Sequence, residues 1–598
     1  MVPDVPAIQR RFDYLVPEAM SGDIRVGSRV RVRLHGRRVA AWVVEVDVVP
    51  PEGVVLQPIA ASSGFGPPAS VVSLAEWAAW RWAGPLSSFL GTASPDRNVR
   101  ALPGVRMASA VAATTSAVGG SAVGGSADEG PAAGGGESDT IIDQALASGR
   151  SVVRLAPALD AVLLVEAIIR RLHRVLVLAP SHQRVDQIAA RLRRLGIPVA
   201  VVPEAWAEAA AGARVVLGTR IAAWAPIKRL DGVLVIDAHD EAYREERAPT
   251  WSAVDVLIER ARRDDAPCVL VTPCPTVALL EGAALVNTSR AAERRGWPPV
   301  EVVDRRGDDP RTGLFSERLS QLLHSVLPDG RAVCILNRTG RARLLACSSC
   351  GSLASCTRCG GALEQQDPGG VLRCRRCGLE RPVVCAVCDS TRMKLLRMGV
   401  SRARDEISAL MGIEAVEITA TSAPGVGSSD SGDHLVVGTE AALHRVGRAD
   451  VVAFLDFDQH LLAPRFAAGE EALALLARAA RVVGGREGGG RILVQTRQPD
   501  HVALSAAVHA DPSRLSDGER DLRAGLDLPP FAALASVGGP AAEELITGLS
   551  KVDGLSVSFL DDTKWLVKAP DHGTLCDGLA SVPRPAGRVR VEVDPTDV

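Results

Sequence analysis

The chain has 598 residues, of which 47% are hydrophobic and 23% charged, a composition typical of a soluble protein with about four domains. Its 68 basic and 70 acidic residues nearly cancel, so net charge points to no partner; only five basic residues are lysines, an arginine bias that we attribute to a GC-rich genome. The first twenty residues lack an apolar signal segment, and the longest uncharged run, 107–127, is too weakly apolar to span a bilayer, so we expect a cytoplasmic protein with no membrane contact.

Short apolar stretches alternate with turn residues between positions 12 and 49, which predicts a small β-barrel or meander. Within it, Arg29, Arg31 and Arg33 alternate with apolar residues and would share one strand face, either as a solvated surface or as a nucleic-acid contact. From 71 to 90 the apolar spacing is helical, and the positions of Trp77 and Trp80 favour core packing over a base-stacking platform.

An Ala/Gly/Ser-rich stretch at 106–139 predicts a flexible linker. After it, strand-like and helix-like segments alternate, which predicts an α/β fold with parallel, doubly wound sheets in two lobes, and a small α+β segment follows from about residue 530. The expected strands are 151–155, 175–178, 215–218, 233–237 and 269–272 in the first lobe, and 331–336, 435–438, 451–456 and 492–495 in the second.

Eight of the twelve cysteines form four C-x2-C pairs: Cys347 with Cys350, Cys356 with Cys359, Cys374 with Cys377, and Cys385 with Cys388. Two thiolates from one turn can reach the same metal, and two pairs complete a tetrahedral site, so this spacing predicts two structural zinc ions. Four pairs can be combined in three ways, and the 14-residue gap from Cys359 to Cys374 favours joining the inner pairs, with the outer pairs closing around them. A disulfide framework is the alternative, but a chain without a secretory signal has no need of one.

Two α/β lobes, a double zinc insert in the second and an N-terminal β-domain together resemble the PriA family of primosomal replication-restart proteins, also called primosomal protein N-prime. The resemblance covers most of the chain. Besides the eight cysteines, it rests on the order and spacing of Phe12-Asp13-Tyr14, Gly218-Thr219-Arg220, Leu336-Asn337-Arg338, Leu455-Asp456-Phe457-Asp458, Val494-Gln495-Thr496, Leu528-Pro529-Pro530-Phe531 and Val593-Asp594-Pro595.

The resemblance implies two RecA-like helicase lobes with a double zinc-ribbon insert. Their expected boundaries are an N-terminal DNA-binding domain at 1–105, the linker at 106–139, the first lobe at 140–315, the second lobe at 316–346 and 395–528, the cysteine module at 347–394, and a C-terminal α+β domain at 529–598. The N-terminal domain would hold the 3′ end of a nascent strand, with the expected DNA-binding residues Phe12, Asp13, Tyr14, Gly36, Arg29, Arg31 and Arg33. Gln57 stands where the family has a lysine, which weakens the expected phosphate contact, and the linker stands where the family has a winged helix.

The segment opposite the family's phosphate-binding loop departs from it. An ATP-driven translocase needs loop amides around the phosphates, a lysine, and a hydroxyl on magnesium. Residues 154–161 contain no glycine, Pro157 lacks an amide donor, and Asp160 places a negative charge where the lysine belongs.

Two further motifs depart from the family. The second acidic motif is Asp237-Ala238-His239-Asp240, one residue short and without the glutamate that would activate water. Arg481 and Arg486 each lie about one residue from the expected arginine-finger position. We therefore expect no bound ATP or Mg²⁺ and no catalytic residues, and we interpret Asp237, His239 and Asp240 as leftover strand-end residues.

The resulting hypothesis is a nucleoid-associated, DNA-binding scaffold that recognises stalled or abandoned forks and promotes reloading of the replicative helicase without unwinding DNA. Its expected partners are branched or forked DNA, single-stranded DNA, primosome proteins, the replicative helicase or its loader, and single-stranded-DNA-binding protein. The alternative is an active ATP-dependent superfamily 2 3′-to-5′ DNA helicase. A zinc-ribbon protein acting on RNA or transcription would explain the cysteines but not the lobe motifs.

Overall fold

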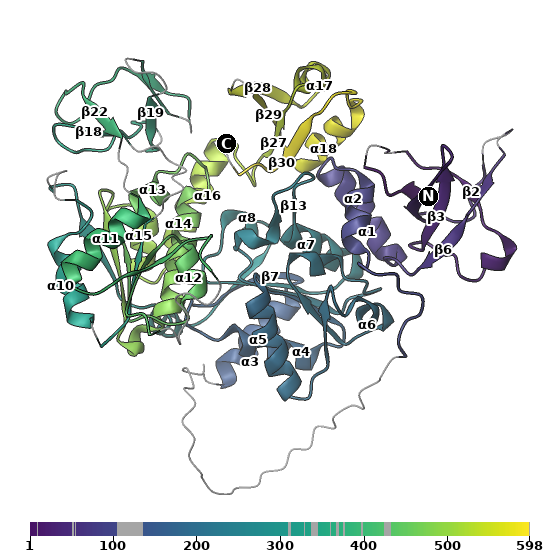
Figure 1. The fold of residues 1–598 in the computed structure, drawn as a ribbon, viewed down its shortest axis with the longest axis horizontal. Coiled ribbons are helices and arrows are strands. Elements are labelled where there is room, and N and C mark those ends of the chain that lie inside the picture. Colours follow the sequence, from purple (N-terminus) through teal and green to yellow (C-terminus); the bar gives the residue numbers. More distant parts are fainter. Residues whose placement is uncertain are drawn as a thin grey trace, which may run out of the picture.

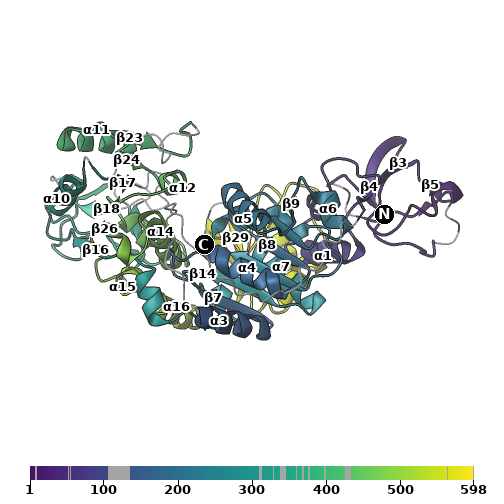
Figure 2. The same ribbon diagram turned by 90° about the horizontal axis from the view of Figure 1, so that it is seen from below.

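The computed structural model describes residues 1–598 except 7, 9, 51–52, 54, 105–134, 309–312, 328, 337–344, 359, 366–369, 375–376, 396–398, 424–431, 562 and 597–598. The parts lie along one long axis, with an N-terminal β-domain at one end, a seven-stranded α/β lobe in the middle and a six-stranded α/β lobe at the other end (Figures 1 and 2). The cysteine module lies beside the second lobe, and the C-terminal domain lies over the first. Across the described ranges, we find no helix whose length and apolarity would let it cross a bilayer.

The N-terminal domain is built on a four-stranded antiparallel sheet in the order β1-β4-β3-β6, with bounds Val2–Pro3, Arg37–Trp42, Arg29–Leu34 and Ala61–Gly64. Every apolar residue of β3 is buried while its arginines lie on the other face, in agreement with the period-two pattern. The β3–β4 hairpin turns at His35 and Gly36, both with positive φ (47° and 77°), a conformation that glycine adopts without strain. A separate parallel pair joins β2 (Tyr14–Leu15) to β5 (Gln57–Pro58).

Two helices follow this sheet, where one helix over 71–90 was predicted. They are α1 (Ala69–Arg81) and α2 (Leu86–Ala93), and Gly84 and Pro85 lie between them. Pro85 lacks an amide hydrogen and interrupts the helix, and a Cβ on Gly84 would lie only 2.5 Å from the ring of Pro249. The predicted linker ends earlier than expected, because α3 (Gly135–Ala147) already begins at its last residues; positions 105–134 lie outside the described residues.

The first lobe contains seven parallel strands in the order β15-β7-β14-β11-β8-β10-β9. Their bounds are Ala284–Asn287, Arg150–Arg154, Cys268–Thr272, Gly232–Ile236, Val175–Leu178, Val215–Gly218 and Val199–Val202. The helices of this lobe are α3, α4 (Ala161–Arg171), α5 (His182–Arg194), α6 (Trp206–Ala211), α7 (Ala253–Asp264), α8 (Val277–Leu280) and α9 (Arg290–Arg295).

Two different sets of helices cover the faces of this sheet. The core on one face is formed with α3, α4 and α5, and the core on the other face with α7 together with α1 and α2 of the N-terminal domain. Val152 contributes to the second core and its neighbour Val153 to the first, because successive residues of a strand point to opposite faces. The N-terminal helices therefore complete the core of the first lobe.

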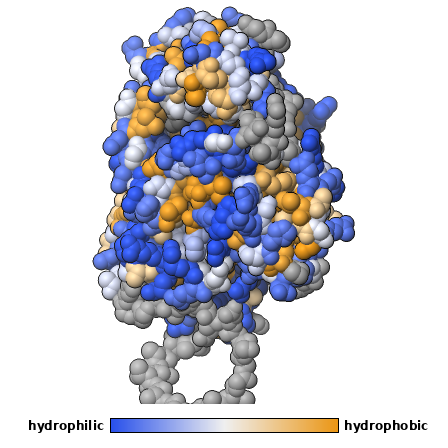
Figure 3. Space-filling view, turned by 90° about the vertical axis from the view of Figure 1, so that its left-hand side faces the viewer, coloured by the Kyte–Doolittle hydropathy of each residue, from blue (hydrophilic) through white to orange (hydrophobic). Residues whose placement is uncertain are grey.

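The second lobe contains six parallel strands in the order β16-β26-β25-β17-β24-β23. Their bounds are Val300–Asp304, Arg491–Thr496, Val451–Phe454, Ala332–Ile335, Leu435–Gly438 and Val416–Ile418, so this sheet begins before the expected boundary at 316. One face is covered by α10 (Glu317–Val326) and α11 (Val400–Met411), and the other by α12 (Ala441–Arg445), α14 (Ala468–Val483) and α15 (Val502–Val508). Figure 3 shows hydrophilic and hydrophobic residues interspersed over this end of the molecule.

The cysteine module is inserted between β17 and α11. Its strands β18 (Leu345–Cys347) and β22 (Met393–Leu395) pair with each other and enclose, in sequence, a three-stranded sheet of β19, β20 and β21 (Leu363–Gln365, Leu372–Cys374 and Glu380–Arg381).

The C-terminal domain is a four-stranded antiparallel sheet that packs against the rest of the chain. Its order is β28-β29-β27-β30, with bounds Ser556–Asp561, Lys564–Ala569, Ala533–Gly538 and Arg590–Val593. Its helices α17 (Ala542–Leu549) and α18 (His572–Ser581) share one hydrophobic core with α1 and the first lobe. One continuous core therefore joins three parts of the chain.

Candidate functional site

The expected 3′-end pocket surrounds the short β2–β5 pair. Tyr14 stands in register with Gln57, and its hydroxyl donates to the backbone oxygen of Arg33 at 2.9 Å. This bond brings β2 close to the hairpin that carries Gly36. The backbone oxygen of Phe12 accepts from the amino terminus of Met1 at 2.8 Å, and Asp13 is exposed. The structure thus brings Tyr14, Gln57 and the hairpin together, while Phe12 is held by the chain's own amino terminus.

The three arginines of β3 do not have equal roles. Arg31 and Arg33 are exposed, and neither forms an ion pair within the described part of the chain. Arg29 is half-buried, and its guanidinium donates to the backbone oxygen of Pro95 at 2.9 Å. Arg38 of β4 lies directly opposite Arg33 and is also exposed, so Arg31, Arg33 and Arg38 form one basic face. Arg29 instead holds the sheet against the segment that follows α2.

The outer cysteine pairs form one cluster and the inner pairs another. In the outer cluster, Sγ of Cys347 lies 3.5 Å from that of Cys388 and Sγ of Cys350 lies 3.6 Å from that of Cys385. The inner cluster contains Cys356, Cys374 and Cys377, with Sγ of Cys356 3.5 Å from Sγ of Cys377, while Cys359 lies outside the described residues. This is the nested grouping that the spacing favours.

The sulfur separations suit a metal site and exclude disulfides. Four sulfurs placed tetrahedrally at about 2.3 Å from a metal are about 3.8 Å apart, whereas a disulfide bond is about 2.05 Å long. Backbone amides support the thiolates, because the N–H of Ser349 donates to Sγ of Cys347 at 3.4 Å. Burial by itself raises the pKa of Cys347, but the amides of Cys350 and Ser349 and the thiol of Cys388 outweigh it and lower that pKa to about 6. The clusters suit soft metal ions such as Zn²⁺, and four-sulfur ligation leaves no open position for catalysis.

In the segment opposite the family's phosphate-binding loop, Asp160 caps α4. Its Oδ1 accepts from the amide of Val162 at 2.9 Å, and its Oδ2 accepts from Arg191 at 3.0 Å. Phosphates bind at helix N-termini that have free backbone amides. The Asp160 carboxylate occupies that position on α4 and accepts the hydrogen bond that the amide of Val162 would otherwise give to a phosphate. The backbone oxygen of Pro157 accepts from Arg481 of the second lobe at 3.3 Å.

The strand-end acids of the first lobe pair with arginines of the second lobe. Asp237 follows β11, and its two carboxylate oxygens accept from Arg481 at 2.7 and 3.0 Å. Asp240 accepts from Arg478 at 3.0 Å. These acids form ion pairs that join the two lobes, a structural contact that their interpretation as leftover strand-end residues did not include. Arg481 makes this contact although its sequence position is displaced from the family's.

Burial and the partner arginine act in opposite directions on Asp237. Burial by itself raises the pKa of Asp237, but Arg481 and His239 outweigh it and hold that pKa below its usual range. Burial lowers the pKa of His239, whose Nδ1 lies 2.8 Å from Oγ1 of Thr272. At neutral pH the cleft thus contains an ionised Asp237 bound to Arg481 and a neutral imidazole.

A cavity of about 860 Å³ lies beside these ion pairs and is lined by both lobes. Its charged lining residues are Asp240, Glu241, Glu440, Glu470, Glu471, Arg465 and Arg478. Both arginines pair with carboxylates that also line the cavity, Arg465 with Glu471 and Arg478 with Asp240. Burial lowers the pKa of the lining His444 to about 4, so it adds no positive charge at neutral pH. A nucleic-acid backbone would meet an excess of negative charge here.

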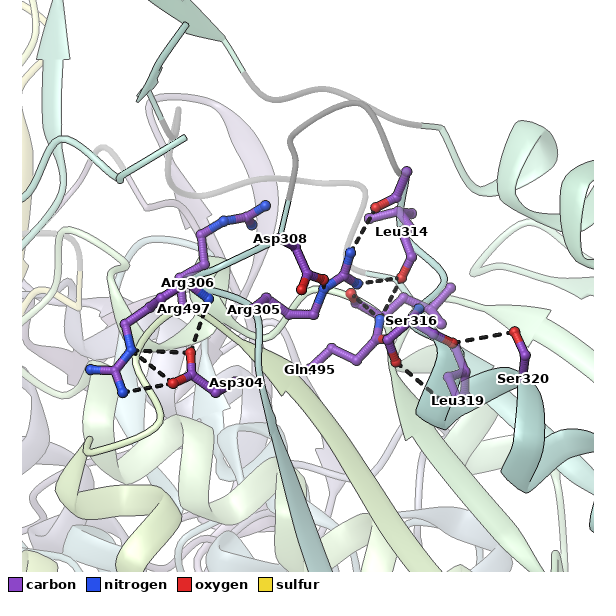
Figure 4. A network of polar contacts seen from close by, with 12 residues as sticks. Asp304, Arg305, Arg306, Asp308, Leu314, Ser316, Leu319, Ser320, Gln495 and Arg497 are labelled. Atoms are coloured by element: carbon purple, nitrogen blue, oxygen red, sulfur yellow. Dashed lines mark hydrogen bonds and ion pairs between the residues drawn. The ribbon is translucent and has the colours of Figure 1, made fainter. Parts of the chain in front are cut away.

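The Val494-Gln495-Thr496 motif has a structural role (Figure 4). The Gln495 side chain accepts from the amide of Ser316 at 3.0 Å and donates to the backbone oxygen of Leu455 at 2.9 Å. Arg305 donates to the backbone oxygens of Leu314 and Gly313 at 2.9 and 3.0 Å. These contacts fix the start of α10 to the ends of β16 and β26.

Asp594 of the Val593-Asp594-Pro595 motif joins three parts of the chain. Its carboxylate accepts from Arg81 of α1 at 2.7 Å and lies 2.8 Å from Nε2 of His572. Arg244 of the first lobe donates to the backbone oxygen of Asp594. Trp77 packs against the shared hydrophobic core, as predicted, whereas Trp80 donates its indole N–H to Asp577 at 2.8 Å. Sequence reasoning missed Arg81, Arg478 and Glu470 as interdomain residues. The available signal was their charge within the largely apolar helices α1 and α14.

Comparison with known proteins shows that the chain is similar to the PriA replication restart proteins. Residues 2–95 match the family model of the PriA 3′ DNA-binding domain (3′BD). The "Probable replication restart protein PriA" of Mycobacterium tuberculosis (strain CDC 1551 / Oshkosh) is 30% identical over 596 residues, which cover 90% of this chain and 86% of that protein. The "Replication restart protein PriA" of Bacillus subtilis (strain 168) is 27% identical over 350 residues, 54% of this chain and 43% of that protein. A solved structure of the helicase Lhr from Mycobacterium smegmatis, bound to ssDNA and AMP-PNP, aligns with 63% of this chain and 47% of its own at 14% identity and a TM-score of 0.33, too low to support an argument.

Proposed function

The chain belongs to the PriA family of replication restart proteins, and from this premise we propose that it recognises stalled or abandoned forks and promotes reloading of the replicative helicase without unwinding DNA itself. A DNA-binding role in replication restart follows from the family and from the match of the N-terminal domain. The finer parts of the proposal rest on the described residues.

The absence of ATP-driven unwinding is supported by one observation above all, the capping of α4 by Asp160. A triphosphate needs the amides of a helix N-terminus and a cation, and here one such amide is bound to a carboxylate that Arg191 holds in place. An aspartate about 4 Å from a phosphate is unfavourable by about 4 kcal/mol per charge pair at a protein-surface dielectric. Asp237, which would have to hold the magnesium ion, is already bound to Arg481.

DNA contact is assigned to the N-terminal domain. The basic face of Arg31, Arg33 and Arg38 is exposed next to the β2–β5 pair, whereas the cavity between the lobes is acidic. Phosphate contacts by this face would bind branched and single-stranded DNA alike, and a 3′ end would be held beside Tyr14 and Asp13.

The cysteine module is proposed to bind two zinc ions and to serve either protein docking or DNA contact. Its two sulfur clusters suit zinc, and a closed zinc site folds the segment that surrounds it. Its partners would be primosome proteins, the replicative helicase or its loader, and single-stranded-DNA-binding protein. In a cell the protein would act at the nucleoid.

The pure protein should show no DNA-stimulated ATP turnover, and it should bind forked DNA with an affinity that falls with salt. Both are measured on one sample, with and without a fork. An Asp160→Lys variant should gain no turnover, because the loop still has no glycine amides. Turnover that Asp237→Ala abolishes would instead establish the alternative, an ATP-dependent superfamily 2 3′-to-5′ helicase.

A further inference from the structure

We propose that α14 of the second lobe is a permanent latch that holds the two lobes closed without nucleotide, with Arg481 on Asp237 as its main contact. This inference rests on the proposed function, since a nucleotide-driven enzyme would have to open and close at this place. The latch residues are defined as Glu470, Arg478 and Arg481 of α14.

The latch residues meet three separate groups of the first lobe. Arg481 binds the Asp237 carboxylate through two nitrogens, and Arg478 binds Asp240. Glu470, two turns before Arg478, accepts from the amide of Val277 at 2.7 Å. Spacings of eight and three residues place all three side chains on one face of the helix. α14 (Ala468–Val483) therefore contacts the first lobe near both of its ends.

Neighbouring contacts support the same closed arrangement. Arg523 of α16 (Ser513–Gly525) is 2% exposed and donates to the second oxygen of Glu470 at 2.6 Å, so the buried carboxylate is satisfied from both lobes. Arg520 of α16 lies 3.2 Å from Glu281 of the first lobe. Ala156, Cys274 and Trp297 of the first lobe lie in the hydrophobic core of the second. Opening the lobes would break ion pairs and apolar packing together.

Nucleotide binding cannot open or close this latch by replacing the contact between Arg481 and Asp237 with contacts to the nucleotide. A γ-phosphate would need Arg481, and a magnesium ion would need Asp237, yet these two groups neutralise each other. Each would have to lose a charged partner inside a site where Asp237 is 5% exposed. The closed state is therefore the resting state, and it fixes the cysteine module relative to the C-terminal and N-terminal domains.

Hydrogen exchange of the full chain tests the latch. The amides of α14 and of residues 237–243 should exchange equally slowly in the wild type alone, with Mg·ATP and with Mg·ADP. Arg481→Gln should raise their exchange by roughly a hundredfold, because it leaves Asp237 buried without its partner. Arg486→Gln is the matched control, since Arg486 also reaches the first lobe but, among the described residues, forms no ion pair and donates to the backbone oxygen of Arg294 at 3.3 Å; its exchange should equal that of the wild type.

A double variant covers the case in which Arg481→Gln does not fold. Asp237→Asn with Arg481→Gln removes both charges, so the chain should fold and show α14 exchange between those of the wild type and of Arg481→Gln. Exchange in α14 that changes with Mg·ATP in the wild type, or that is unchanged in both Arg481 variants, would overturn the latch. ATP turnover, measured on the same samples, separates the two proposals: turnover with protected α14 would refute only the proposed function, and mobile α14 without turnover would refute only the latch.

Discussion

The carboxylate of Asp237 and the guanidinium of Arg481 share two hydrogen bonds of 2.7 and 3.0 Å, although the residues are 244 positions apart in the chain. One residue ends a strand of the first lobe and the other lies on a helix of the second. The pair thus joins the two lobes at the end of β11.

Removing one side of this pair should destabilise the protein. We expect Arg481→Gln to lower the free energy of unfolding by about 3 kcal/mol, the low end for a buried pair, because the Arg481 side chain is 44% exposed and that of Asp237 only 6%. Urea unfolding measures this loss. Arg486→Gln should change stability by less than about 0.5 kcal/mol. If the Asp237→Asn and Arg481→Gln effects simply add in the double variant, the two residues are not coupled.

The metal content of the module is the second prediction. The purified chain should contain two zinc ions, and Cys356→Ser with Cys374→Ser should lose one while the outer cluster keeps its ion, because the two sets of sulfurs are separate. Elemental analysis after reduction measures the zinc content. Cys334→Ala is the control, since Cys334 is a free cysteine buried in β17, and it should retain both ions. Loss of both ions from the double serine variant would contradict separate sites.

The basic face should control DNA affinity and its salt dependence. Arg31→Ala and Arg33→Ala should each weaken fork binding about equally for all sequences and reduce the salt slope by about one. Titrations at several salt concentrations measure this slope. Arg29→Ala should lower stability more than it lowers DNA affinity, because Arg29 is bound to Pro95. Arg402→Ala, on α11 and paired with Glu406, should leave binding unchanged.

Acid should weaken the junction at Asp594. Burial by itself raises the pKa of Asp594, but Arg81 and His572 outweigh it and hold that pKa well below its usual range. A depressed carboxylate pKa adds stability that is fully present above the unfolded value of about 3.9 and is lost as pH falls toward the folded value. Asp594→Asn should therefore be less stable than the wild type at pH 7, and the difference should shrink below about pH 4.

Urea unfolding at pH 7 and at pH 3 measures this difference. Val591→Ala provides the control: it removes apolar volume from β30 without removing a titratable group, so its destabilisation should not depend on pH in this way. An Asp594→Asn difference that stays constant between the two pH values would contradict the assignment.

The sequence determined the central strands of both sheets. β8, β10 and β24 have the predicted bounds, because strands buried on both faces form continuous apolar runs that need no knowledge of their neighbours. The four unpredicted strands of the two large parallel sheets, β9, β15, β16 and β23, are the edge strands of those sheets. An edge strand is partly exposed and can carry polar residues, and a glutamate breaks the apolar run of β16 and of β23. β9 contains no polar residue but is only four residues long and half-buried at alternate positions.

The residues of the functional sites also fall into two groups, those that a local sequence pattern identifies and those that only the tertiary structure brings together. The four cysteine pairs and the missing glycines of the 154–161 segment are local features, and the sequence by itself determined both. Only the tertiary structure decided that Arg29 is a packing contact while Arg31 is exposed, and that Asp237 meets Arg481. Charges far apart in sequence have no local pattern that pairs them. The packing of one lobe on the other decides which of these charges meet. That packing is the physical reason why Asp237 and Arg481 form a pair.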